Sequence, residues 1–202
     1  VVALVESIEK RNPKSQYLSQ VYPVYLVALN DSGQAAKIVT VAENRLPNDP
    51  ASEDLLLVLA NSYMAQSNKA KATGYAEKLV EVLNTKAKPE GMADADWDKK
   101  KSGALGRGYW ISGVNYAEGK RYKEADQSLR AALPLLQGQN EVLGPALFYL
   151  GVANYEMAKP GKNKKLAAEA VKFSDQSAAI KGAYQTQAQK NARGIRTEFA
   201  IK

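Results

Sequence analysis

The chain has 202 residues, of which 45% are hydrophobic and 24% charged, so it is long enough to bury a sizeable core. It contains no cysteine and no histidine, which excludes disulfides, thiolate zinc sites and catalysis by cysteine or histidine. The formal net charge is +7, from 28 basic and 21 acidic residues, so an anionic partner is one hypothesis to weigh.

The N-terminal residues 1–11 form a short amphipathic segment without the basic start of a signal peptide. The uncharged run over residues 15–30 is too polar and too short to span a bilayer. We therefore expect a soluble chain. No residue identifies the compartment, and an exported or periplasmic protein whose leader precedes Val1 is consistent with the sequence.

Apolar residues recur with a helical period along the whole chain, and alternating strand patterns are scarce. Clusters of glycine, proline, asparagine and aspartate separate the helical segments. We expect Ser52 or Asp49 to cap one helix, and Asp94 and Asp96 to open another. The fold class is all-α. The predicted helices cover residues 2–11, 14–30, 33–46, 51–66, 69–84, 94–118, 121–137, 140–158, 163–180 and 183–199.

The helices align as repeated pairs. Counted from Gly106, the third pair places Tyr109, Gly113, Tyr116, Tyr122, Ala125, Leu129 and Ala132 at positions 4, 8, 11, 17, 20, 24 and 27. Counts from Gln16, Glu53 and Gly144 place Tyr22, Leu26, Ala35 and Ala42, then Leu56, Ala60, Tyr63 and Ala72, then Leu147, Leu150 and Gly151, at matching positions. Small residues at positions 8 and 20 would allow two antiparallel helices to cross closely, and the large residues would fill the space around the crossing.

These residues resemble the tetratricopeptide repeat family over about residues 16–180, most strongly at 106–139. The resemblance implies one domain, a right-handed superhelix of about four helix pairs near residues 16–47, 53–84, 94–139 and 144–180, with capping helices at 1–11 and 183–199. The pattern is similar to that of bacterial exported repeat proteins. The repeats begin at residues 16, 53, 106 and 144, and the longest offset comes from residues 85–105.

Trp97 lies within this extra stretch, 12 residues before Tyr109 and on roughly the same helical face. We expect it to pack on the preceding pair and extend the core. The alternative is an exposed aromatic anchor on a binding face.

The resemblance implies a concave binding face built from positions 2, 5, 9, 12 and 13 of each first helix. In the first two pairs these are Tyr17, Gln20, Val24, Val27 and Ala28, then Asp54, Leu57, Asn61, Met64 and Ala65. In the last two they are Arg107, Trp110, Val114, Ala117 and Glu118, then Pro145, Phe148, Val152, Tyr155 and Glu156.

Aromatic and arginine side chains dominate many interfaces, so the candidate partner-binding residues are Asn61, Arg107, Trp110, Phe148 and Tyr155. The competing interpretation is that the final helices pack against these aromatics and fill the groove. The family's carboxylate clamp needs lysine and asparagine at positions 5 and 9 of the first repeat. Gln20 and Val24 stand there, which argues against binding of a peptide C-terminus of that type.

The positive charge is concentrated near the C-terminus. Residues 1–158 carry equal numbers of basic and acidic side chains, whereas residues 159–202 carry 10 basic and 3 acidic ones. The candidate basic patch is Lys162, Lys164, Lys165, Lys190, Arg193 and Arg196. It is either a docking surface for an anionic partner or a solvated cap. Nucleic acid is disfavoured, because basic residues are not interleaved with aromatics and no nucleic-acid-binding module is present.

Catalysis without histidine or cysteine would need paired carboxylates or an activated lysine. The acidic groups lie at predicted helix starts, where the helix dipole favours them, and we expect no catalytic, metal or cofactor site. The leading hypothesis is a non-enzymatic scaffold that binds a peptide or partner protein in the concave groove. The alternatives are binding of an anionic polymer or surface by residues 159–202, and self-assembly into homo-oligomers through the repeat ends.

Overall fold

The structure is a computed structural model that describes residues 1–15 and 17–201. Gln16, from which the first repeat was counted, and Lys202, the last residue of the basic region, lie outside the described residues. The described residues form helices and no strand, which confirms the all-α prediction. The helices are α1 (Val2–Arg11), α2 (Leu18–Asp31), α3 (Ala35–Arg45), η1 (Leu46–Asn48), α4 (Glu53–Ala65), α5 (Lys69–Thr85), α6 (Asp94–Glu118), α7 (Tyr122–Ala132), η2 (Leu133–Leu135), α8 (Asn140–Ala158), α9 (Lys164–Ala178) and α10 (Gln185–Phe199).

A proline accounts for the largest difference between a predicted and an observed helix end. Helix α7 was expected to reach residue 137, but it ends at Ala132 and passes into the 3₁₀ turn η2, which contains Pro134. Helix α3 ends in the same way at η1, which contains Pro47. A proline has no N–H to donate to the preceding turn and its ring crowds that turn, so each α-helix tightens and stops.

Side chains cap several helix starts, among them those of α4 and α9. The Ser52 hydroxyl accepts a hydrogen bond of 3.5 Å from the Leu55 N–H, which confirms one of the two expected caps of α4. The Asn163 side-chain oxygen accepts bonds from the N–H groups of Lys165 and Leu166 at 3.0 and 3.2 Å. The second cap starts α9 directly after the Pro160–Lys162 turn.

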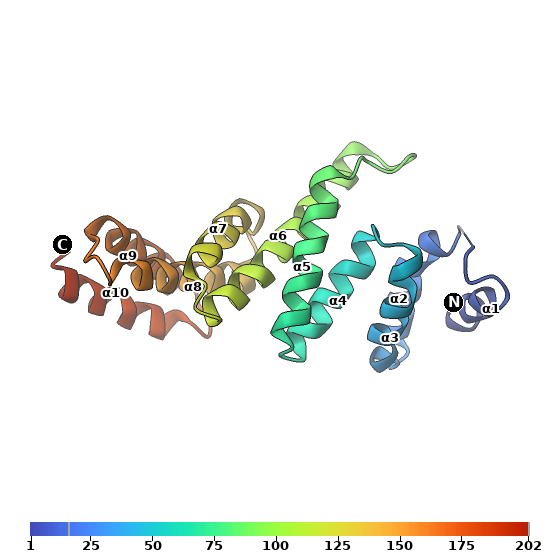
Figure 1. Cartoon of the computed structure of the whole chain (residues 1–202), viewed down its shortest axis with the longest axis horizontal. Helices are drawn as coiled ribbons and strands as arrows, with labels where there is room; N and C mark the ends of the chain where they lie inside the picture. The colour runs from blue at the N-terminus through green and yellow to red at the C-terminus, as the bar shows by residue number, and fades with distance from the viewer. Residues whose placement is uncertain (16, 202) are drawn as a thin grey trace. The chain divides into compact units, whose positions relative to one another are not determined.

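The chain divides into two compact units, Val1–Thr85 and Lys86–Lys202, here called unit 1 and unit 2. Each is described by itself. The division falls where the offset between repeats is longest. Consecutive helices pack as pairs, with α4 on α5 in unit 1 and α6 on α7 and α8 on α9 in unit 2 (Figure 1). Trp97 on α6 is only 5% exposed, so the expectation of burial is confirmed and the exposed anchor was wrong.

Glycines allow the close helix crossings of unit 2. A Cβ on Gly113 of α6 would lie 2.5 Å from Cγ of Leu129 on α7. A Cβ on Gly151 of α8 would lie 2.6 Å from Oγ of Ser174 on α9. Both distances are far below van der Waals contact, so only glycine fits. These two glycines occupy position 8 of their repeats, which confirms the predicted role of that position in these pairs.

The first pair, α2 and α3, departs from this arrangement. Ala35 was expected at the crossing, as position 20, but it is exposed. The equivalent Ala72 and Ala125 are fully buried and are each the fourth residue of their helix, whereas Ala35 is the first residue of α3. Because α3 begins one turn later, its crossing with α2 is built differently.

A polar network in unit 1 converges on Glu43 of α3. Its carboxylate accepts hydrogen bonds from the Tyr63 hydroxyl at 2.6 Å, the Lys71 ammonium at 3.0 Å and the Tyr75 hydroxyl at 3.3 Å. These donors hold the pKa of Glu43 below its ordinary value, with the Tyr63 bond contributing most. The rings of Tyr63 and Tyr75 stack with their centroids 5.7 Å apart. The network therefore joins α3, α4 and α5.

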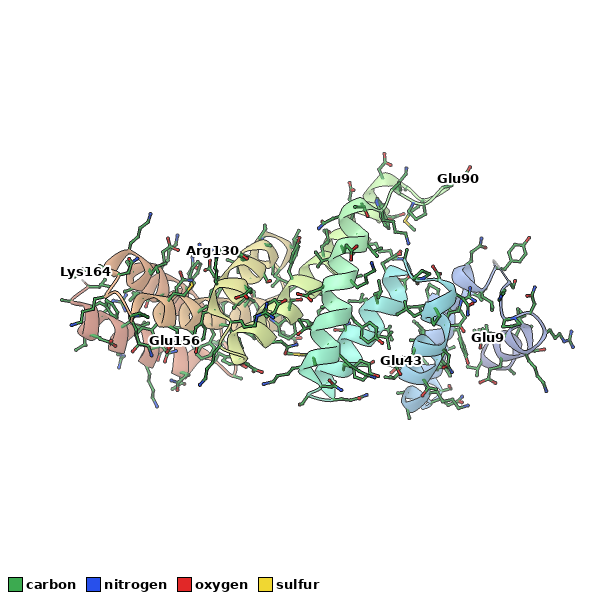
Figure 2. All side chains as sticks on the ribbon, in the orientation of Figure 1. Glu9, Glu43, Glu90, Arg130, Glu156 and Lys164 are labelled. Atoms are coloured by element: carbon green, nitrogen blue, oxygen red, sulfur yellow. The ribbon has the colours of Figure 1, made fainter. Side chains whose placement is uncertain are left out.

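A second network lies beneath Arg130 in unit 2. The fully buried Asn154 of α8 donates to Asp126 of α7 at 2.6 Å and to the Leu150 carbonyl at 3.0 Å. Arg130, labelled in Figure 2, donates to both carboxylate oxygens of Asp126 at 2.9 Å and pairs with Glu169 of α9. The network ties three successive helices together, so Asp126 has a structural role.

Candidate functional site

The main candidate site in unit 2 is a groove between α8 and α10, with a volume of about 430 Å³. We call it the α8–α10 groove. Its walls are mixed, with apolar and aromatic side chains on α8 and mainly polar ones on α10. The lining residues are Phe148, Gly151, Val152, Tyr155, Glu156, Gln187, Lys190, Asn191, Gly194, Ile195 and Glu198.

Contacts at both ends of the groove show that α8 and α10 run in the same direction. Phe148 packs on Tyr184 just before α10 begins, with the ring centroids 4.6 Å apart. Tyr155 packs edge-on against Phe199, the last residue of α10, at 6.3 Å. The helices also share α9 as a support, because α10 packs mainly on α9. Helix α10 thus lies beside α8 (Figure 1), and residues of both helices line the groove.

Two of the predicted partner-binding residues, Phe148 and Tyr155, therefore line the groove together. Val152 and Glu156, which the repeat resemblance assigns to the same face, line it with them. The partner-binding role of these aromatics stays a prediction, whereas the competing interpretation is confirmed in part. The final helix does pack against Phe148 and Tyr155, yet the groove beside them stays open.

Hydrogen bonds and charges define the end of the groove nearest the C-terminus. The Tyr155 hydroxyl donates to the Glu198 carboxylate at 2.6 Å, and this bond raises the pKa of Tyr155. Glu156 pairs with Lys159 at 2.7 Å and raises the pKa of that ammonium. Because Glu156 is already paired with Lys159, Glu198 is the carboxylate that makes this end of the groove acidic.

Arg107 and Trp110 form a separate pair on α6. The Arg107 guanidinium lies 4.3 Å from the centre of the Trp110 ring, a cation–π contact. Burial lowers the pKa of Arg107 because it penalises the charged form. The buried Nε1 of Trp110 has no hydrogen-bond partner among the described residues. Neither side chain lines the α8–α10 groove, so the structure divides the predicted aromatic strip into two parts.

Asn61 belongs to α4 of unit 1. Its side-chain amide donates to the Leu57 carbonyl one turn earlier, at 2.9 Å. That bond occupies one donor and holds the side chain against its own helix.

Unit 1 has a groove of its own, of about 410 Å³, between α2 and the helices α3 and α4. We call it the α2–α4 groove. Val27 and Leu57 line it and occupy face positions that the repeat resemblance identified, but they were not among the selected binding candidates. Tyr17, directly before α2, and Val24 and Val27 within it are each more than half exposed. The apolar residues at these positions are the sequence feature that could have indicated this groove. The lining residues are Pro23, Leu26, Val27, Asn30, Ile38, Asp54, Leu57 and Val58.

The predicted basic patch separates into two groups. Lys162, Lys164 and Lys165 are exposed around the start of α9, where Lys164 is labelled in Figure 2. Lys190, Arg193 and Arg196 lie on α10. Arg196 is held by Asp175 of α9 in a two-pronged ion pair, with N–O distances of 3.2 and 2.5 Å, and Lys190 lines the α8–α10 groove. Binding of an anionic polymer or surface through this region stays a prediction.

Within the described part of the chain, residues 1–15 and 17–201, no group of three or more aspartate or glutamate side chains is arranged to hold a metal ion. No helix there is long and apolar enough to cross a membrane.

Comparison with known proteins found no protein-family model and no curated protein that matches the chain. The tetratricopeptide resemblance therefore stands on the repeat positions alone.

Proposed function

We propose that the protein is a non-enzymatic scaffold that binds a peptide segment of a partner protein, with the α8–α10 groove as its principal site. One observation carries the proposal. In each unit, an open groove is lined by first-helix positions that the repeat pattern assigns to a binding face, including Val27 and Leu57 in unit 1 and Val152 and Tyr155 in unit 2.

The dimensions and lining of the α8–α10 groove support a peptide as its occupant. The groove wall runs from Gln187 to Glu198, two residues eleven positions apart on the helix, or about 16 Å at a rise of 1.5 Å per residue. An extended peptide covers that length with about five residues at 3.3 Å each. The apolar wall on α8 would bury side chains, and the polar groups on α10 would orient the backbone.

Gly194 provides a direct test. It lies in the middle of α10 on the groove wall, and a Cβ there would meet no atom within 4 Å. Gly194→Leu fills the groove and raises helix propensity by about 1 kcal/mol, so the fold is retained. Peptides selected from a random library on the wild-type chain should bind Gly194→Leu at least tenfold more weakly in a fluorescence anisotropy titration.

Gly103→Leu is the matched control. Gly103 is also a helical glycine of unit 2 with nothing within 4 Å of a built Cβ, and it does not line the groove. Equal affinity of the selected peptides for the wild type and both variants would contradict the proposal.

Self-association is a second candidate function, and the distribution of exposed apolar residues favours it. All five large hydrophobic side chains that are exposed among the described residues lie within the first 27 residues, at one end of the chain. They are Val1, Leu4, Tyr17, Val24 and Val27. Light scattering would give a dimer mass for the wild type and a monomer mass for Leu4→Lys combined with Val24→Lys. A monomer mass for the wild type at high micromolar concentration would exclude this candidate.

A further inference from the structure

The groove-facing stripe of α10 has a defined order of charge. Lys190, Gly194 and Glu198 are spaced four residues apart, so they lie above one another on a single face of the helix. Along the stripe, the Lys190 cation is followed by an open space at Gly194, here called the notch, and then by the Glu198 anion. Glu156 of α8 lies in the same lining but is already paired with Lys159, so Glu198 is the available anion of the stripe.

The cation of this stripe is available to a ligand. The Lys190 side chain is exposed and forms no ion pair or hydrogen bond among the described residues. Other lysines of unit 2 are already paired, such as Lys159 with Glu156 at 2.7 Å. At the opposite end, the Glu198 carboxylate accepts a hydrogen bond from the Tyr155 hydroxyl and forms no ion pair among the described residues. The two ends of the stripe are therefore open to partners of opposite sign.

The notch between them is suited to an apolar side chain. Because Gly194 has no side chain, the groove wall is recessed there, and the space faces Val152 and Tyr155 on α8. Ile195 borders the same space from α10. A leucine-sized side chain placed in the notch would bury apolar surface against the groove lining, which favours binding.

We infer that the α8–α10 groove selects an extended peptide segment with an acidic side chain at Lys190, an apolar side chain at Gly194 and a basic side chain at Glu198. The distance between the two charged residues of the groove matches the spacing of side chains on an extended peptide. Lys190 and Glu198 are eight helical residues apart, or about 12 Å, and two side chains four residues apart on an extended peptide are about 13 Å apart. This inference rests on the proposed peptide-binding function and specifies its ligand.

Three synthetic peptides test the inference on the full chain. Each is a fluorescein-labelled, C-terminally amidated peptide with a central leucine. The flanking residues, two positions to either side, are aspartate and lysine in the mixed probe, two aspartates in the acidic probe and two lysines in the basic probe. Anisotropy titrations at low salt should show the mixed probe binding wild type at least fivefold more tightly than either of the others. Added salt should reduce this preference, because exposed charges are screened.

Lys190→Glu changes the expected order. It makes both ends of the stripe acidic, so the basic probe should become the tightest ligand and the mixed probe should weaken. Lys165→Glu is the control, since it changes the net charge by the same amount at an exposed position on α9 outside the groove. That variant should keep the wild-type order of the three probes.

The outcomes separate this inference from the proposal on which it rests. If all three probes bind equally and lose affinity in Gly194→Leu, the groove binds peptides but the charge order is overturned. The same conclusion follows if Lys165→Glu changes the order as much as Lys190→Glu does. If binding is insensitive to Gly194→Leu, the peptide groove itself is refuted.

Discussion

The Tyr155 hydroxyl on α8 donates a hydrogen bond of 2.6 Å to the Glu198 carboxylate on α10. This bond joins the two walls of the groove at its acidic end. It holds the carboxylate of Glu198 in place and leaves the aromatic ring of Tyr155 as part of the groove lining. One contact thus contributes both to packing of the last helix and to the shape of the candidate site.

Tyr155→Phe should lower the free energy of unfolding by about 1 kcal/mol or less, the usual net contribution of a solvent-accessible hydrogen bond. The phenylalanine ring keeps the contact with Phe199. The decrease in the free energy of unfolding therefore measures the contribution of the hydroxyl alone. Urea denaturation measures it. Tyr109→Phe is the control, because the Tyr109 hydroxyl has no hydrogen-bond partner among the described residues. A larger loss in the control than in Tyr155→Phe would contradict this account of the bond.

Gly113→Ala should destabilise the protein by about 1–3 kcal/mol, the usual cost of forcing atoms into a well-packed core. The added Cβ would overlap Leu129 and push α6 away from α7. Gly103→Ala lies on the same helix, in open space, and should instead be neutral or stabilising by up to about 1 kcal/mol. Denaturation curves of the two variants that shift by the same amount would show that the crossing is not tight.

Asn154→Leu should lower the free energy of unfolding by about 2–4 kcal/mol. The substitution removes the buried amide that donates to Asp126, and a buried acceptor that loses its donor is costly, more so when it is charged. Asp126 keeps its bonds from Arg130, which limits the loss. An Asn154→Leu variant as stable as the wild type would show that this network is dispensable.

The hydrogen bonds to Glu43 should make the stability of the protein depend on pH. The pKa of Glu43 is lowered in the folded chain, so its contribution is complete above the ordinary glutamate pKa of about 4.3 and is lost as the pH falls through the lower, folded value. Glu43→Gln should therefore lower the thermal midpoint at pH 7 and have little effect at pH 2. A difference between the two proteins that is as large at pH 2 as at pH 7 would contradict the assigned network.

The repeat pattern predicted the number and order of the α-helices because each helix has its own apolar period and its own breaks. The close crossings were also predictable, since Gly113 and Gly151 recur at one repeat position and a missing Cβ has a single geometric consequence. The end of α3 before Pro47 was predicted to within one residue, whereas α7 was expected to continue past Pro134 and stops at Ala132. There a proline follows an otherwise helical pattern and converts the last turn into a 3₁₀ turn.

The candidate site was only partly predictable. The repeat positions grouped Phe148 and Tyr155 correctly, because both depend on the phase of one helix. They could not show that α10 would form the opposite wall, since its distance from α8 depends on tertiary packing through α9. The pairing of Arg196 with Asp175 was missed for the same reason, because the two residues lie on different helices and 21 positions apart.

The most direct test of the central claim is to locate the bound peptide on the chain. At 21.9 kDa the protein suits amide chemical-shift mapping by NMR, with a library-selected peptide as the titrant. The account predicts that the largest shift changes fall in residues 148–156 and 187–198, and that they disappear in Gly194→Leu but persist in Gly103→Leu. Shift changes centred on α7 and the outer side of α9, with residues 187–198 unaffected, would contradict it.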